Sequence, residues 1–150
     1  MIPRYTRPEM GKIWEEREKL QRMLDVEIAV CEELAARGEI PAEALKAIRS
    51  KSAFDPERIR EIERVTKHDV IAFLTNVAEN VGPASRYIHL GLTSSDVLDT
   101  SLALQLVSAA GLIIEGISNL QDTLRHRALE HRRTIIAGRS HGMHAEPTTL

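Results

Sequence analysis

The sequence has little of several residue types, and each scarcity excludes a class of protein. A single cysteine, Cys31, excludes an internal disulfide and, with no recognisable signal peptide, favours a cytoplasmic protein. Aromatic residues make up only 3% of the chain, which disfavours β-rich folds. The formal net charge of −2 provides no basic field to attract nucleic acid. No continuous run approaches the roughly 20 apolar residues of a membrane span.

The chain is instead rich in aliphatic residues at helical spacing. Hydrophobic residues make up 43% of its 150 residues, enough for one domain or parts of two. Apolar positions recur every three or four residues from Leu20 to Ala35, which predicts an amphipathic helix ended by Gly38. Cys31 lies on the apolar side of this helix, so we interpret it as a core residue rather than a nucleophile.

Local start and stop signals predict further helices in the first 90 residues. They are, in chain order, a capping box at Thr6–Glu9, a proline start at Pro41, an acid-proline start at Asp55–Pro56 and a stop at Gly82–Pro83. Between the last two signals the helical pattern is interrupted at residues 66–69. The sequence therefore predicts short helices joined by tight turns.

The stretch Tyr87–Thr100 contains the clearest helix start of the chain. Thr93 supplies a hydroxyl cap, Ser94 follows it, and Asp96 places an acid in the first turn. A hydroxyl-rich helix start gathers unpaired N–H groups and suits a carboxylate or phosphate ligand. The alternative is that these residues only cap the helix.

A very long helix is predicted from Ser94 to about Arg132. It would span roughly 55–60 Å and is apolar nearly all round at its middle, so it must be buried in a bundle or between subunits. We therefore expect oligomerisation. A basic cluster, residues 125–133, lies at its C-terminal end and is explained more simply by the helix dipole than by nucleic-acid binding.

Two polar groups in the first 90 residues are candidates for phosphate binding. Arg4 and Tyr5 place a cation beside a phenol, which suits a phosphate or a base. Lys67, His68 and Asp69 place a cation, an imidazole and a carboxylate between two apolar runs. For both groups, ordinary solvated surface is the alternative interpretation.

The last residues, Gly138–Leu150, hold a histidine between glycines. Backbone freedom beside His141 lets its imidazole be aimed at a ligand. Together with His144 and Glu146, His141 forms part of a metal-ligand pattern. Because a fourth ligand is lacking, we expect no metal site. Residues 134–137 are β-branched and apolar and suggest a short extended segment, whereas Pro147 is expected to open a helix.

Taken together, these stretches resemble the adenylosuccinate lyase family of the fumarase/aspartase superfamily. Four motifs carry the resemblance, which covers the whole chain: Arg4-Tyr5, Lys67–Asp69, Gly91–Asp96 and Gly138–Thr149. Each motif alone is unspecific, but their order and spacing are highly specific.

The resemblance implies an all-α fold. Residues 1–90 would form a small N-terminal helical domain, and residues 91–150 would begin a central bundle of long helices. It also implies a cytoplasmic homotetramer whose active sites are shared between subunits, acting on a nucleotide substrate without a cofactor. Neither nucleic acid nor a membrane is expected as a partner.

The implied reaction is a β-elimination that releases fumarate, either from adenylosuccinate to give AMP or from the succinyl-carboxamide imidazole ribotide SAICAR to give AICAR, both in purine biosynthesis. His141 matches the catalytic histidine, the expected general acid. His68 matches a second functional histidine near the substrate phosphate, able to assist the first. Thr93 and Ser94 match hydroxyls that hold the succinyl carboxylates.

Further positions of the chain match residues that bind the nucleotide in the family. Arg4, Tyr5, Lys67 and Asp69 match nucleotide-binding positions, and His89 lies in a matching loop as a further candidate. The remaining histidines, His126, His131 and His144, are expected to be structural.

The family's proposed base is a serine in a mobile loop expected beyond Leu150. We therefore expect the chain to be part of a longer protein and residues 1–150 alone to be inactive.

Two alternatives remain. A related carboxymuconate cycloisomerase shares a similar T-S-x-D-x-x-D-T stretch, although Arg4-Tyr5 and Lys67–Asp69 favour a phosphate-bearing substrate. A non-catalytic scaffold that oligomerises through the long helix is the other.

Overall fold

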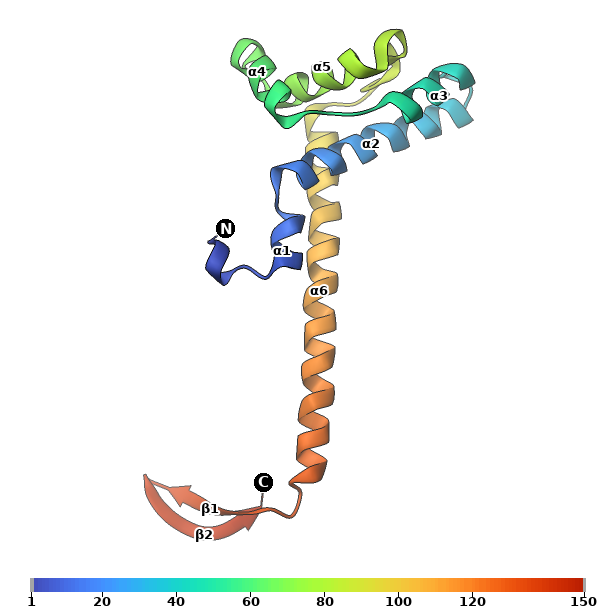
Figure 1. The fold of residues 1–150 in the computed structure, drawn as a ribbon. Coiled ribbons are helices and arrows are strands. Elements are labelled where there is room, and N and C mark those ends of the chain that lie inside the picture. The colour runs from blue at the N-terminus through green and yellow to red at the C-terminus, as the bar shows by residue number, and fades with distance from the viewer. Residues whose placement is uncertain (1, 150) are drawn as a thin grey trace. The chain divides into compact units, whose positions relative to one another are not determined.

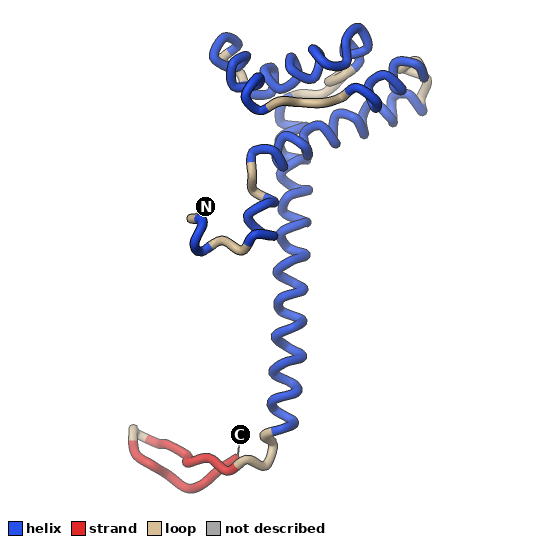
Figure 2. Tube along the Cα trace, viewed as in Figure 1, coloured by secondary structure: helices blue, strands red, loops and turns tan. Residues whose placement is uncertain are grey.

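The computed structural model describes residues 2–149 (Figure 1). In chain order the elements are η1 (Pro3–Tyr5), α1 (Pro8–Ile13), α2 (Glu16–Ala36), α3 (Ala42–Lys51), α4 (Pro56–Thr66), α5 (Asp69–Val81), η2 (Gly82–Tyr87), α6 (Ser94–Glu130), β1 (Ile135–Ser140) and β2 (Met143–Thr149). The described residues are 72% helical with one small two-stranded sheet (Figure 2), which confirms the predicted all-α class. Contacts divide it into two compact units, Met1–Ala109 and Ala110–Leu150. The predicted domain boundary after residue 90 stays a prediction.

The core of the first unit lies where α2, α3, α4 and α5 pack together (Figure 1). Val70, Phe73 and Val77, at helical spacing on α5, are completely buried. The Phe73 ring lies 6.3 Å, centroid to centroid, from the ring of Phe54. Burying a phenylalanine contributes about 1.5–3 kcal/mol, so packing of this apolar face stabilises helices that are too short to persist alone.

Several helix boundaries lie where the sequence predicts them. α2 ends at Ala36, and Gly38 follows with φ +79°, donating its N–H to the Ala35 carbonyl at 3.0 Å. At the start of α4 the Asp55 carboxylate accepts the Glu57 N–H at 3.0 Å. These predictions are confirmed because each depends only on neighbouring residues.

The capping box predicted at Thr6–Glu9 is wrong. α1 begins at Pro8, and Arg7 occupies the cap position without a side-chain hydrogen bond to the helix. A residue that precedes proline is held in extended backbone, which makes Arg7 rather than Thr6 the last residue outside the helix. The Thr6 hydroxyl instead donates to the Ile2 carbonyl at 2.8 Å.

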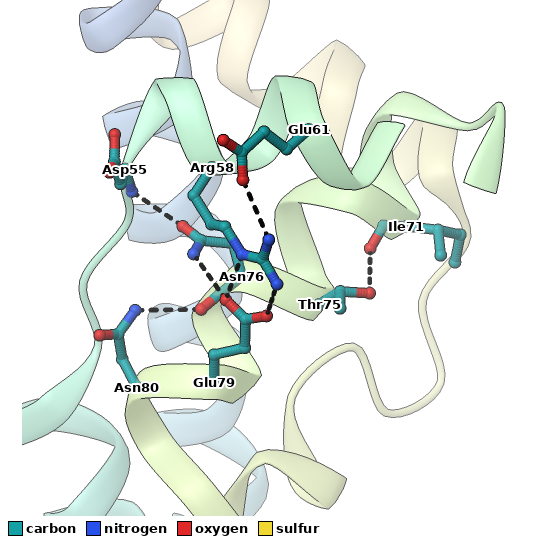
Figure 3. Close-up of polar contacts among 8 residues, drawn as sticks. All are labelled: Asp55, Arg58, Glu61, Ile71, Thr75, Asn76, Glu79 and Asn80. Carbon is teal, nitrogen blue, oxygen red and sulfur yellow. Dashed lines mark hydrogen bonds and ion pairs between the residues drawn. The ribbon is translucent and has the colours of Figure 1, made fainter. Parts of the chain in front are cut away.

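A polar network fastens the open end of the α4–α5 hairpin (Figure 3). The buried Asn76 side chain accepts the Asp55 N–H at 2.8 Å and donates to Glu79 at 3.2 Å. Arg58 donates to both oxygens of Glu79, at 3.2 and 2.7 Å. These hydrogen bonds raise the pKa of Arg58 and lower that of Glu79. The network joins the start of α4 to the last turns of α5, and the two helices are connected at their other end by the two-residue turn Lys67-His68.

The first turns of α6 pack within the first unit. Val97, Ser101, Gln105 and Ala109 recur every four residues and are buried. The Gln105 amide donates to the carbonyl of Ile13, the last residue of α1, at 2.6 Å. The helix ends at Glu130, close to the predicted end near Arg132, so the predicted long helix is confirmed.

The second half of α6 leaves its apolar side chains exposed. Ile113, Ile114, Ile117, Leu120 and Leu124 all have more than half of their surface accessible. Over residues 2–149, α6 is the one helix long and apolar enough to cross a membrane, by length and composition alone, with a mean hydropathy of 1.8 over 18 residues. Core helices of soluble proteins share this property.

The end of the described chain is an antiparallel hairpin of β1 and β2. Ser140 pairs with Met143 across a two-residue turn in which His141 has φ +53° and Gly142 φ +76°. Positive φ at both central residues is the geometry of a type I′ turn, which suits the twist of two antiparallel strands. The extended segment suggested for residues 134–137 thus continues as a full strand.

The helix start expected at Pro147 is wrong. Pro147 lies in β2, opposite Ala137, where the register shifts between Ala137 and Arg139. Proline is tolerated there because an edge strand does not require its missing N–H. Gly138 occupies this irregularity, and a Cβ on it would lie 2.6 Å from the Glu146 carbonyl oxygen.

Candidate functional site

The start of α6 is capped by its own acid. Asp96 accepts the Thr93 N–H at 2.7 Å and the Thr93 hydroxyl at 3.0 Å. These two hydrogen bonds, with a contribution from the neighbouring His89, lower the pKa of Asp96 below its ordinary value of 3.8. Ser94 is the first helical residue and is half-buried. The acid in the first turn caps the helix as predicted, whereas the Thr93 hydroxyl donates to Asp96 and, among the bonds of the described residues, accepts no helix N–H. Carboxylate binding by Thr93 and Ser94 stays a prediction.

The Lys67–Asp69 triplet makes the closed turn between α4 and α5. Lys67 adopts φ +54°, and His68 is the N-cap of α5, its Nδ1 accepting the Ile71 N–H at 3.4 Å. The same Nδ1 lies 3.5 Å from the Asp69 carboxylate. All three residues are exposed, so the His68 ring is accessible to a ligand.

A second histidine of the first unit, His89, is held by a carboxylate of α2. His89 donates its backbone N–H to Glu27 Oε2 at 2.8 Å, and its ring Nδ1 lies 2.6 Å from Glu27 Oε1. Glu27 belongs to α2 and is only 1% exposed. Glu27 was not predicted from the sequence as a functional residue, although it lies among Met23, Leu24 and Cys31 on the apolar face of α2.

The Arg4-Tyr5 pair lies on η1. The Arg4 guanidinium stacks on the Tyr5 ring at 4.8 Å from the centroid, and both side chains are exposed. The pair therefore presents a cation and a phenol to solvent, and its binding role stays a prediction.

His141 lies in the second unit, at the exposed tip of the hairpin. Its positive φ comes from the turn geometry, and the adjoining Gly142 completes the turn. His144, expected to be structural, lies on β2 with its ring 3.4 Å from Arg139. The hairpin thus projects an imidazole from a defined backbone.

Within the described part of the first unit, no hydrogen bond or ion pair joins Arg4-Tyr5, Lys67–Asp69 and Thr93-Ser94 to one another. An open groove of about 670 Å³ runs between α2 and the first turns of α6, beside Asp96, but none of the predicted substrate-binding residues lines it. Each of the three groups is therefore ordered by contacts with its own neighbours and not by contacts with the other two.

Cys31 is confirmed as a core residue. It is 1% exposed, and burial, aided by the carboxylates of Glu27 and Glu32, raises its pKa from 9.0 to about 11. Because only the thiolate is a good nucleophile, this thiol is unreactive near neutral pH. Among residues 2–149, no group of three or more His, Cys, Asp or Glu side chains is arranged to hold a metal ion.

Comparison with known proteins gives the family. The model of a protein family described as lyase matches residues 4–150. The chain belongs to this lyase family. The predicted resemblance is confirmed at the level of individual relatives: the chain is 62% identical to an adenylosuccinate lyase of Synechocystis and 51% identical to one of Aquifex aeolicus.

These lyases are longer than the chain. Each alignment covers all of the chain and 35% of the relative, so the chain spans about a third of the length of the curated relatives it matches. Solved structures agree with the family. A fumarate lyase from Mesorhizobium matches 93% of the chain and 34% of its own, at 29% identity and a TM-score of 0.83. A 3-carboxy-cis,cis-muconate lactonizing enzyme from Pseudomonas putida matches 97% of the chain and 35% of its own, at 35% identity and a TM-score of 0.84.

Proposed function

We propose that this chain is part of an adenylosuccinate lyase, which eliminates fumarate from adenylosuccinate to give AMP and from SAICAR to give AICAR in purine biosynthesis. The observation that carries the proposal is the 62% and 51% identity to adenylosuccinate lyases over the whole chain. In the reaction a base removes a proton beside a carboxylate and the resulting electron pair forms the new C=C bond. The C–N bond breaks, and an acid protonates the departing nitrogen.

The proposed general acid is His141. Its position on a tight, defined turn favours this role, because a proton donor must be aimed at the departing nitrogen. The proposed partner is His68, whose exposed ring is suited to donating a hydrogen bond to a phosphate oxygen.

The remaining contacts divide between the two ends of the substrate. Thr93 and Ser94 would bind the succinyl carboxylates at the α6 start, where the helix dipole favours negative charge. The N–H and hydroxyl of Thr93, which donate to Asp96 in this structure, would then have to turn to the substrate. The nucleotide would be bound by four residues matched through the family resemblance, Arg4, Tyr5, Lys67 and Asp69. His89 is a further candidate for substrate contact.

The assembly proposed is a cytoplasmic homotetramer with active sites shared between subunits. The exposed apolar half of α6 supports it, because side chains such as Ile117 and Leu120 need a covering partner. Glu115 and Asp122 lie in the same half, which favours packing against other helices over burial in lipid. No cofactor, nucleic acid or membrane is part of the proposal.

The test is a spectrophotometric assay of fumarate release from adenylosuccinate by the full-length protein, with His141→Gln as the variant. Loss of a general acid lowers kcat by about 100- to 10,000-fold while assembly is retained. His126→Gln, which changes an exposed histidine of α6, is the matched control and keeps full activity. Wild-type protein that fails to release fumarate from adenylosuccinate would refute the proposal.

A second candidate is lactonization of a carboxymuconate. The match to the Pseudomonas putida lactonizing enzyme favours it, although at 35% identity that match is weaker than those to the adenylosuccinate lyases. Offering 3-carboxy-cis,cis-muconate to the same full-length protein separates the two candidates. A non-catalytic scaffold would turn over neither compound.

A further inference from the structure

A buried carboxylate lies on the apolar face of α2. Glu27 is 1% exposed and is flanked one turn before and after by the buried Met23 and Cys31. A carboxylate in such surroundings is strongly destabilising unless it is fully hydrogen-bonded. A carboxylate at this position therefore requires hydrogen-bonding partners for both of its oxygens.

Both oxygens of Glu27 are directed to a single residue 62 positions away. Oε2 accepts the His89 backbone N–H at 2.8 Å, and Oε1 lies 2.6 Å from ring atom Nδ1. His89 has φ +65°, a left-handed conformation that is strained for a residue with a Cβ. One carboxylate thus fixes the backbone and the ring of the same histidine.

The contact determines which ring nitrogen carries the proton. A carboxylate only accepts, so a neutral His89 must be protonated on Nδ1 and keep a lone pair on Nε2. The exposed His68 has no such buried partner, since its Nδ1 lies 3.4 Å from the Ile71 N–H nitrogen and 3.5 Å from Asp69 Oδ1.

The accessible part of His89 lies near the start of α6. Its side chain keeps 19% of its surface exposed, and its ring is close enough to Asp96 to affect that carboxylate electrostatically. Thr93 and Ser94 are the proposed carboxylate-binding residues; Thr93 lies four residues after His89, and Ser94 is the first residue of α6. His89 is therefore close to the proposed substrate site.

We propose that Glu27 is a positioning residue: it holds His89 as the Nδ1–H tautomer, so that Nε2 accepts a hydrogen bond from an N–H or O–H of the substrate bound at the start of α6. This inference rests on the proposed lyase function. Glu27 itself is buried beneath His89 and acts only through it.

The first test is the protonation state of His89 in the full-length wild-type protein. Imidazole ¹⁵N spectra of histidine-labelled protein, with His89 assigned by its loss in His89→Ala, should show a pyrrole-type Nδ1 and a pyridine-type Nε2. Glu27→Gln replaces one acceptor by an amide N–H, which donates to Nδ1 and shifts the proton to Nε2. A wild-type His89 protonated on Nε2, either alone or together with Nδ1, would overturn the proposal without any need for a variant.

The second test is kinetic. Glu27→Gln should lower kcat/KM for adenylosuccinate about 10- to 100-fold, as loss of an orienting carboxylate does elsewhere. In the His89→Ala background the same change should have no further effect, since Glu27 acts only through His89. Glu33→Gln, on the same helix and in an exposed pair with Arg37, is the matched control and keeps wild-type kinetics.

The outcomes separate this inference from the proposed function. Wild-type turnover with an unaffected Glu27→Gln, or equal losses in the two backgrounds, overturns the inference alone and leaves a purely structural pair. Absence of wild-type turnover overturns the proposed function, and with it the substrate contact.

Discussion

The two halves of α6 are built from similar residues but meet different surroundings. In the first half, Val97 is fully buried and Gln105 hydrogen-bonds to the end of α1. In the second half, Ile114 and Ile117 are 63% and 61% exposed. The first half is stabilised by helices of its own unit, whereas the second has the composition of a core without the elements to cover it. An apolar helix face therefore predicts that the helix is buried, but it does not show whether the same chain or another one covers it.

The largest effect is expected when a charge is placed in the exposed half. Ile117→Glu in the full-length protein should abolish assembly and reduce turnover at least about 100-fold, because a carboxylate in an apolar interface is left unpaired. Sedimentation velocity and the fumarate assay measure both effects. Val65→Glu, at an 83% exposed position of α4, is the control for assembly and should leave the sedimentation coefficient unchanged. An assembled Ile117→Glu protein would contradict the interface.

In residues 1–150 alone, shortening a side chain should destabilise the core of the first unit far more than the second half of α6. Phe73→Ala should lower the free energy of unfolding by about 3–5 kcal/mol, since it leaves a cavity in the core. Ile114→Ala should change it by less than about 0.5 kcal/mol, as surface substitutions usually do. Urea denaturation followed by circular dichroism measures both. Similar losses for the two variants would show that the second half of α6 is already packed in the isolated chain.

A smaller effect is expected at the start of α4. Asp55→Ala removes the acceptor of the Glu57 N–H and should destabilise the first unit by about 1 kcal/mol. The backbone bond from residue 55 to Asn76 remains in this variant, which limits the loss. The midpoint of urea denaturation tests the value, and an unchanged midpoint would show that the cap contributes nothing.

The smallest effect concerns pH. Hydrogen bonding to Arg58 lowers the pKa of Glu79 below its ordinary value of 4.5 in the folded state. The resulting stabilisation is present above pH 4.5 and is lost as the pH falls through the lowered value. Unfolding free energies at pH 7 and pH 3 should therefore differ less in Glu79→Gln than in the wild type. Equal pH dependence would show that the exposed pair is screened by solvent.

Local sequence signals predicted much of the first unit. The ends of α2, α4 and α5 follow from Gly38, Asp55 and Gly82, since each acts on neighbouring backbone groups. Thr6 failed as a cap because the proline after Arg7 moved the helix start by one residue. Such errors arise where two local rules compete.

The parts that the sequence did not predict depend on distant partners. The Glu27–His89 contact joins residues 62 positions apart, and no local rule links them. In the hairpin, Pro147 was assigned to a helix because its strand depends on pairing with Ala137. The roles of His68, Thr93 and His141 were inferred from the family resemblance and stay predictions.

Fumarate release from adenylosuccinate, measured for residues 1–150 alone beside the full-length protein, tests most directly whether catalysis depends on what surrounds this chain. We predict steady turnover by the full-length protein and none by the isolated residues, because the apolar half of α6 is then uncovered. Turnover by the isolated residues at a comparable rate would contradict it.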